Sequence, residues 1–119
     1  MEFEFKKKYD LETRKIESQK ILEKYSERVP VICEKDPNSK IETIQKTKYL
    51  CPIDMTVNQF INIIRLKLNL AQESSLFLLV GGGKSTITGN QTMSEVYQIH
   101  KDKDDGFLYI TYASEIIWG

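Results

Sequence analysis

The fold of this chain is decided by one stretch, MTVNQFINIIRLKLNL at residues 55–70. Thr56 followed three residues later by Gln59 is the pattern of a capping box, and Met55 and Phe60 are placed as a hydrophobic staple around it. Apolar residues then continue along one side of the helical wheel, which predicts a helix from Thr56 to about Leu70. That apolar face consists of Ile61, Ile63, Ile64 and Leu68.

Strand patterns lie on both sides of this helix. Before it, residues 29–34 (VPVICE) are mostly apolar, with a proline that fits an edge strand or a first strand position. A second strand is expected from Lys46 to Pro52. After the helix, Leu76–Val80 is a continuous apolar run, which predicts a central strand buried on both faces between parallel neighbours. The alternating residues 107–112 (FLYITY) predict the last strand.

Helical patterns also occur near both ends of the chain. Thr92 and Glu95 form a second capping box, which predicts a short helix through Ile99. Asp10 is placed as the N-cap of a helix that extends to Tyr25. Its apolar side is expected to consist of Leu11, Ser18, Ile21, Leu22 and Tyr25.

The first residues combine Phe3, Phe5 and Tyr9 with lysines 6–8. Such a segment could touch anionic lipid, but it is short, and we expect it to pack as a helix that precedes the first one.

The order of these elements predicts an α+β fold. A four-stranded mixed sheet around a central helix, preceded by a helical extension, is the element order of a ubiquitin-like β-grasp. We expect an N-terminal helical extension at residues 1–26, the β-grasp domain at 27–112 and a flexible tail at 113–119. At 119 residues the chain is long enough for one core.

Composition limits the function classes. Lys+Arg and Asp+Glu both number 17, and this balance argues against a nucleic-acid partner. A single histidine and two isolated cysteines make no convincing metal site, so Cys33 and Cys51 are expected to be buried in a reducing cytosol. A catalytic cysteine with His100 as base is an alternative that the spacing does not support. Gly83-Lys84-Ser85 lacks the earlier glycine of a phosphate loop, because Leu78 stands there.

The last residue, Gly119, offers a terminal carboxylate without a side chain, beyond the predicted last strand. A protein whose own end is activated and joined to an amine needs such an end. The hypothesis is a transferable tag, and the alternative is that the chain ends on glycine by accident.

Several separate motifs resemble one family, the autophagy ubiquitin-like modifiers represented by GABARAP and microtubule-associated protein light chain 3. The motifs are RVPVICEK (28–35), KYLCP (48–52), TVNQF (56–60), HKDK (100–103) and DGFLY (105–109). The resemblance extends from Phe5 to Gly119. It departs from the family at Gly81–Gln91, which is longer and richer in glycine, and at Asp104–Asp105, which adds a residue.

The resemblance implies that Gly119, after the aromatic Trp118, is the site of lipid conjugation. In that family an activating enzyme uses ATP, a conjugating enzyme carries the chain as a thioester, and the amine of phosphatidylethanolamine completes the amide. A cysteine protease processes precursors or removes the lipid. The chain itself is then expected to be no enzyme and to bind no cofactor. It is expected in the cytoplasm before conjugation and on autophagosomal or other cytosol-facing membranes afterwards.

The alternation of the first two strands predicts where partners bind. If Val31 and Cys33 face the core, Pro30 and Ile32 face outward with Lys48 and Leu50, which gives an exposed apolar strip. The resemblance implies a first pocket for an aromatic residue of autophagy receptors with a short aromatic-x-x-aliphatic motif, formed by Glu17, Ile21, Pro30, Ile32, Lys48, Leu50 and Phe107. It implies a second pocket for the aliphatic residue, formed by Tyr49, Cys51, Pro52, Met55, Phe60 and Ile63.

Between the pockets the partner is expected to add a strand beside Lys46–Leu50. Arg28, Lys46 and Lys48 would favour partners with acidic flanks. Three alternatives stay open: these apolar residues fill the core and the lysines are solvated, the tag is attached to proteins, or the chain is an unconjugated peptide-binding adaptor.

Overall fold

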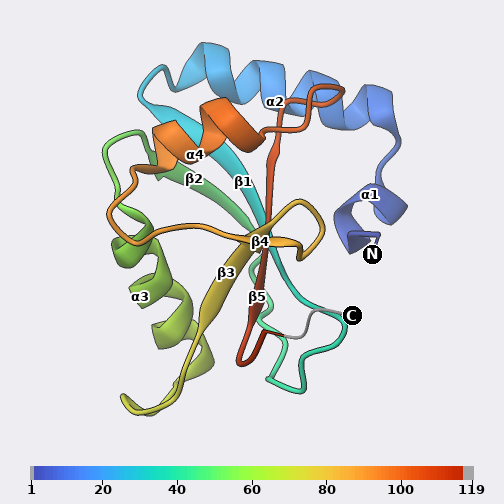
Figure 1. Cartoon of the computed structure of the whole chain (residues 1–119). Helices are drawn as coiled ribbons and strands as arrows, with labels where there is room; N and C mark the ends of the chain where they lie inside the picture. The colour runs from blue at the N-terminus through green and yellow to red at the C-terminus, as the bar shows by residue number, and fades with distance from the viewer. Residues whose placement is uncertain (1, 117–119) are drawn as a thin grey trace.

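The computed structural model describes residues 2–116 (Figure 1). The described part contains two N-terminal helices, a mixed sheet and two further helices. In chain order they are α1 (Glu4–Lys8), α2 (Leu11–Lys24), β1 (Arg28–Lys35), β2 (Lys48–Pro52), α3 (Val57–Leu68), β3 (Phe77–Val80), β4 (Ser85–Thr86), α4 (Met93–His100) and β5 (Leu108–Ala113).

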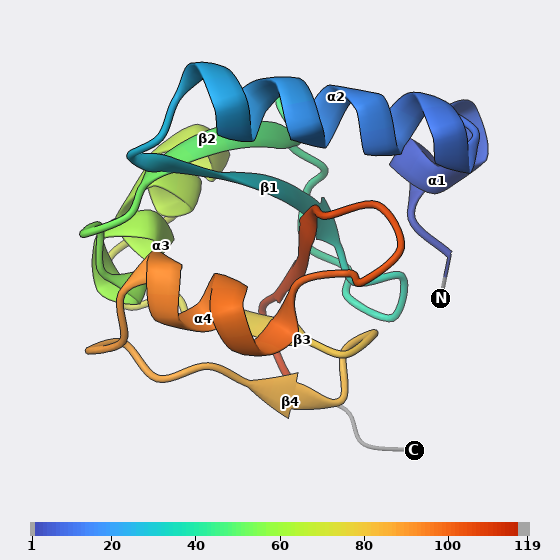
Figure 2. The ribbon, with the colours of Figure 1, turned by 90° about the horizontal axis from the view of Figure 1, so that it is seen from above.

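The sheet has five strands in the order β2-β1-β5-β3-β4. β1 and β5 are parallel, and the other neighbouring pairs are antiparallel. Figure 2 shows α2 on one side of the sheet and α3 and α4 on the other. The predicted α+β class, with a sheet around a central helix, is therefore confirmed.

Two details of the predicted sheet are wrong. The sheet has five strands where four were predicted. The additional strand, β4, is only two residues long, lies within the expected polar loop and pairs with β3. β3 is buried as predicted, but both of its neighbours are antiparallel rather than parallel. A continuous apolar run reports burial on both faces and carries no information on strand direction.

Pro30 also lies in an unexpected place, because β1 is an interior strand of the sheet. Pro30 is opposite Leu50 on β2, and the parallel ladder with β5 begins only at the next residue, where Val31 is opposite Leu108. Proline has no main-chain N–H to donate, and Pro30 lies one residue before the first residue pair of the parallel ladder.

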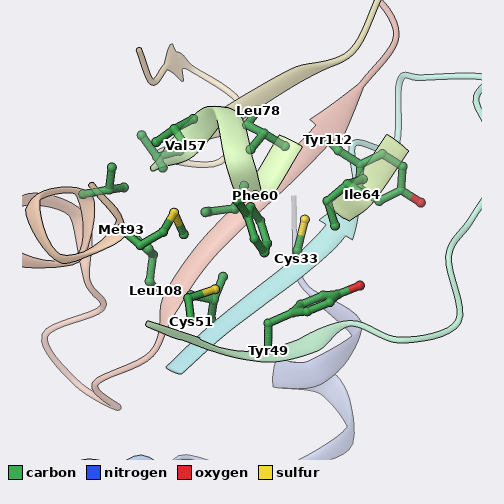
Figure 3. Close-up of a cluster of buried hydrophobic side chains, with 14 of the residues drawn as sticks. Cys33, Tyr49, Cys51, Val57, Phe60, Ile64, Leu78, Met93, Leu108 and Tyr112 are labelled. Atoms are coloured by element: carbon green, nitrogen blue, oxygen red, sulfur yellow. The ribbon is translucent and has the colours of Figure 1, made fainter. Parts of the chain in front are cut away.

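Helix α3 organises the main core. Its predicted capping box is confirmed, since the Thr56 side chain accepts from the Gln59 amide and the Gln59 side chain accepts from the Thr56 amide. The helix ends at Asn69, which is left-handed with φ 53°. Figure 3 shows Phe60 and Ile64 of α3 reaching into a cluster with Tyr49, Cys51 and other buried side chains of the sheet.

The predicted apolar side of α2 is confirmed at Ser18 and Ile21 and wrong at its three other residues. Asp10 caps the helix as expected, with its carboxylate accepting from the Thr13 amide at 2.9 Å. However, Leu11, Leu22 and Tyr25 are exposed, and the buried residue of α2 is Ser18. The helix contacts the rest of the protein partly through hydrogen bonds, which an apolar wheel does not detect.

The segment at residues 3–8 forms α1, as expected. Phe3 and Phe5 are buried with Ile32 and Phe107 in a second, smaller apolar cluster on the α2 side of the sheet. Within residues 2–116, none of the helices is long and apolar enough to cross a membrane.

Phe60→Ala should lower the free energy of unfolding by about 3–5 kcal/mol, because Phe60 is fully buried and the truncation leaves a cavity. Urea denaturation measures the change. Leu66→Ala is the matched control on the same helix, since Leu66 is 81% exposed, and it should change stability by less than about 0.5 kcal/mol. Similar losses in the two variants would contradict the placement of Phe60 at the centre of the core.

Candidate functional site

The candidate site is the outer edge of β2, the first strand in the sheet order. The amide of Cys33 donates to the carbonyl of Thr47 at 2.8 Å, which fixes the pairing of β1 with this segment. By the alternation of an antiparallel ladder, Lys48 and Leu50 point their main-chain N–H and C=O groups away from β1. In the described part of the chain no other strand covers that edge.

Side chains of β2 alternate between the two faces of the sheet. Lys48 and Leu50 lie opposite Ile32 and Pro30, on the face that α2 covers. Tyr49 and the other odd-numbered residues lie on the α3 face. The β2 residues of the first pocket therefore lie on the α2 face, and Tyr49 and Cys51 of the second pocket lie on the α3 face. Pro52 of the second pocket, at the end of β2, has the parity of Leu50.

The first pocket is assembled, but it is not the exposed strip that alternation predicted. Ile32 and Phe107 have no exposed surface, because Phe3 and Phe5 pack against them, and the Phe5 and Phe107 ring centroids are 5.0 Å apart. Pro30 is also buried. The parts open to solvent are the half-buried Glu17, Ile21 and Leu50 and the exposed Lys48.

An ion pair joins the two sides of the first pocket. The Lys48 ammonium donates to the Glu17 carboxylate, so β2 and α2 are connected directly at the first pocket. Both charged side chains are partly exposed, so the pair is expected to contribute little to stability.

The second pocket is a smaller surface than predicted. Tyr49, Cys51 and Phe60 belong to the main core, and the Tyr49 and Phe60 rings meet edge to face at 5.4 Å. These three residues form the base of the pocket and not its lining. The partly exposed members are Pro52, Met55 and Ile63.

The three predicted cations lie along the same edge. Arg28 donates from its guanidinium to the Leu50 carbonyl at 3.0 Å, so it covers one of the outward-facing acceptors of β2. The Lys46 ammonium lies 5.1 Å from the centre of the Tyr49 ring. Lys48 is the third of these cations, and all three side chains are exposed.

A separate cleft of about 620 Å³ lies between α1, the end of β1 and the segment that precedes β2. Its apolar lining includes Phe5, Tyr9 and Ile44, and of the predicted site residues only Lys48 borders it. The cleft is therefore a neighbour of the first pocket and does not coincide with either predicted pocket. The strand edge, and not the cleft, carries the outward-facing main-chain groups of β2.

The residues that hold the first pocket together were not among the predicted site residues. Phe3 and Phe5 close its floor from the N-terminal segment, and their alternation beside Tyr9 was the available signal. Arg14 and Asp105 form a buried ion pair beside it, with Nε and Oδ2 2.9 Å apart. No local pattern connects these two residues, because they are far apart along the chain.

The start of the tail is fixed to the loop between β1 and β2. The Ser114 amide donates to the Ser39 hydroxyl at 3.2 Å, and Ser39 is buried. The Asp36 amide donates to the Tyr112 carbonyl at 2.9 Å in the same region. The predicted conjugation residue Gly119 and the preceding Trp118 lie outside the described residues.

The two cysteines are buried and unpaired with each other, which disfavours the catalytic alternative. Burial raises the pKa of the Cys51 thiol to about 12 and raises that of Cys33 further above its usual value. A thiol nucleophile acts as the thiolate, so these cysteines are in the unreactive form near neutral pH. His100, the alternative base, is exposed at the end of α4.

Comparison with known proteins gives a consistent result. Residues 13–119 match the family described as autophagy protein Atg8, ubiquitin like. Autophagy-related protein 8 of Candida glabrata is 47% identical over 120 residues, which cover 100% of this chain and 98% of that protein. The protein of the same name from Coccidioides immitis is 45% identical, with 100% and 99% covered. The crystal structure of Trypanosoma brucei ATG8 superposes with a TM-score of 0.89 at 34% identity over the whole of both chains.

Neither cysteine should react with a disulfide reagent such as DTNB in the native protein at pH 8, because that pH lies far below the raised pKa values. Both should react within minutes in urea, where the thiols regain ordinary pKa values. Absorbance of the released thiolate measures the reaction. Rapid labelling of the folded protein would revive the cysteine as a candidate nucleophile.

Proposed function

This chain belongs to the Atg8 family of ubiquitin-like autophagy proteins, and we propose that it is joined through Gly119 to phosphatidylethanolamine and then serves as a membrane-bound docking scaffold for receptors with an aromatic-x-x-aliphatic motif. The observation that carries the docking part is the free edge of β2 between two apolar surfaces. The conjugation part rests on the family and on the terminal glycine.

An extended peptide suits the edge of β2. Its main chain would pair with the outward N–H and C=O groups of Lys48 and Leu50, which gives affinity independent of sequence. Side chains three positions apart on a strand point to opposite faces. An aromatic residue would therefore enter the first pocket on the α2 face, and the aliphatic residue three positions later would reach Met55 and Ile63 on the α3 face, next to Pro52 at the end of β2.

Charge supports an acidic partner. Arg28, Lys46 and Lys48 border the edge, and acidic side chains beside the motif would complement them. Arg28 has a further role in this proposal, because it donates to the Leu50 carbonyl that a docking strand would need. The incoming amide replaces Arg28 there, and the guanidinium becomes available to a carboxylate of the peptide.

In the proposed conjugation this chain is the acyl donor, and the thiols that carry the acyl group belong to the enzymes. Its terminal carboxylate attacks ATP on the activating enzyme, which forms an acyl adenylate and releases pyrophosphate. A cysteine thiolate displaces AMP to give a thioester, which passes to the conjugating enzyme. The lipid amine then displaces that thiol, forming the amide, and a cysteine protease reverses the linkage or exposes the glycine.

The lipid would place the chain on a membrane. Each buried CH₂ contributes about 0.8 kcal/mol, and two acyl chains suffice for stable anchoring where one is marginal. The unconjugated chain would be cytoplasmic, and the conjugate would lie on autophagosomal or other cytosol-facing membranes. Attachment to proteins, or a peptide-binding adaptor without conjugation, are the alternatives.

Leu50→Ala should weaken binding of an acidic Trp-x-x-Leu peptide by about tenfold or more, because it removes apolar contact from the first pocket. Isothermal titration measures the affinity. Leu70→Ala is the control, since Leu70 is also a half-buried leucine but follows the end of α3. An unchanged affinity in Leu50→Ala, with the fold intact by circular dichroism, would refute the docking assignment.

Gly119→Val should abolish conjugation when the chain is incubated with activating and conjugating enzymes of an Atg8 system, ATP and liposomes that contain phosphatidylethanolamine. A Cβ at this position obstructs the close approach that the acyl transfer requires. Mass spectrometry of the product distinguishes the lipid amide from attachment to protein lysines. Membrane recruitment of the variant at the wild-type level would favour the unconjugated adaptor.

A further inference from the structure

Two parts of the first pocket, besides its residues from β1 and β2, come from segments that are far apart in sequence. Helix α2 provides Glu17 and Ile21, and Phe107 lies just before β5. Ile21 packs against the cluster that contains Phe107. The width of the pocket therefore depends on how α2 is held relative to the loop that leads into β5.

Asp105 is bonded to both parts. One carboxylate oxygen accepts from the Phe107 amide at 2.9 Å. The other accepts from Arg14 Nε of α2 at 2.9 Å and from the Tyr109 hydroxyl of β5 at 2.5 Å. Its main-chain carbonyl accepts from the Ser18 hydroxyl of α2.

These bonds are shielded from solvent. The Asp105 side chain has no exposed surface, and that of Arg14 is only 11% exposed. Burial and then the hydrogen bond to Asp105 raise the pKa of Tyr109, so the phenol stays a donor. Buried charged hydrogen bonds of this kind are costly to disrupt, which favours one fixed arrangement.

The loop also approaches α2 closely. Gly106 has φ +82°, and a Cβ there would lie 2.8 Å from the Ser18 hydroxyl. Its carbonyl accepts from the Tyr97 hydroxyl of α4 at 2.7 Å. The residue after Asp105 is thus held between α2 and α4, which leaves α2 little freedom to slide.

We propose that Asp105 is a positioning residue that fixes α2 against Phe107 and thereby sets the affinity of the first pocket for an aromatic side chain. This inference rests on the proposed docking function. Asp105 does not touch the peptide in this proposal and acts through Arg14, Ser18 and Phe107. Its effect should therefore fall on the aromatic residue of the motif and not on the rest of the peptide.

Asp105→Asn tests this role against Asp104→Asn, which removes the same charge from an exposed neighbour. Asparagine has one acceptor oxygen, so it cannot accept from the Phe107 amide and from Arg14 through separate oxygens. NMR titration would measure binding of an acidic Trp-x-x-Leu peptide and of the same peptide with Trp replaced by Ala. Asp105→Asn should weaken the Trp peptide by about fivefold or more and change the Ala peptide less than about twofold. Asp104→Asn should leave both within about twofold of wild type.

Equal weakening of both peptides by Asp105→Asn, or no weakening of either, would overturn the proposal. If Asp105→Asn does not fold, Tyr109→Phe replaces it, because it removes one bond to Asp105 and keeps the ring, and it should again affect only the Trp peptide. A wild-type chain that binds neither peptide refutes the docking function together with this inference. Wild-type binding of the Trp peptide that Asp105→Asn leaves unchanged refutes the positioning role alone.

Discussion

The parallel pairing of β1 with β5 determines how the other parts of the molecule are placed. It brings the first and last strands together in the middle of the sheet, with Val31 opposite Leu108 and Lys35 opposite Tyr112. β2 runs antiparallel to β1 and consequently lies at one edge of the sheet. β3 and β4 lie on the other side of β5. The same pairing sets the start of β5 beside the N-terminal helices, where the first pocket forms, and its end beside the β1–β2 loop.

The sequence predicted those parts of the fold that have local causes. The capping boxes at Thr56 and Thr92 are each contained within four residues, and both helices begin where these boxes predicted. β4 had no such signal, because two exposed residues after three glycines do not form a hydrophobic pattern. The leucines of α2 were misplaced for a different reason, since the wheel correctly placed Ser18 on the buried side but could not show that the contact there is a hydrogen bond and not an apolar one.

The same division applies to the candidate site. Alternation correctly placed Leu50 with Pro30 and Ile32 on one face, but it could not show that α1 covers Ile32, because that contact joins residues that are remote in sequence. Alternation could have identified Tyr49 as core, since it pairs with the buried Val31. Membership of the pockets came from family resemblance, and the full set of contacts of Asp105 could come only from the folded arrangement.

The bond between Ser114 and Ser39 has a mechanical consequence for a lipid-linked chain. Ser114 is held to the body of the protein, so only the residues from there to Gly119 can act as a tether. An extended chain spans at most about 3.5 Å per residue, which limits that tether to about 17 Å. In the proposed lipid-linked form, the domain would then lie within that distance of the bilayer surface.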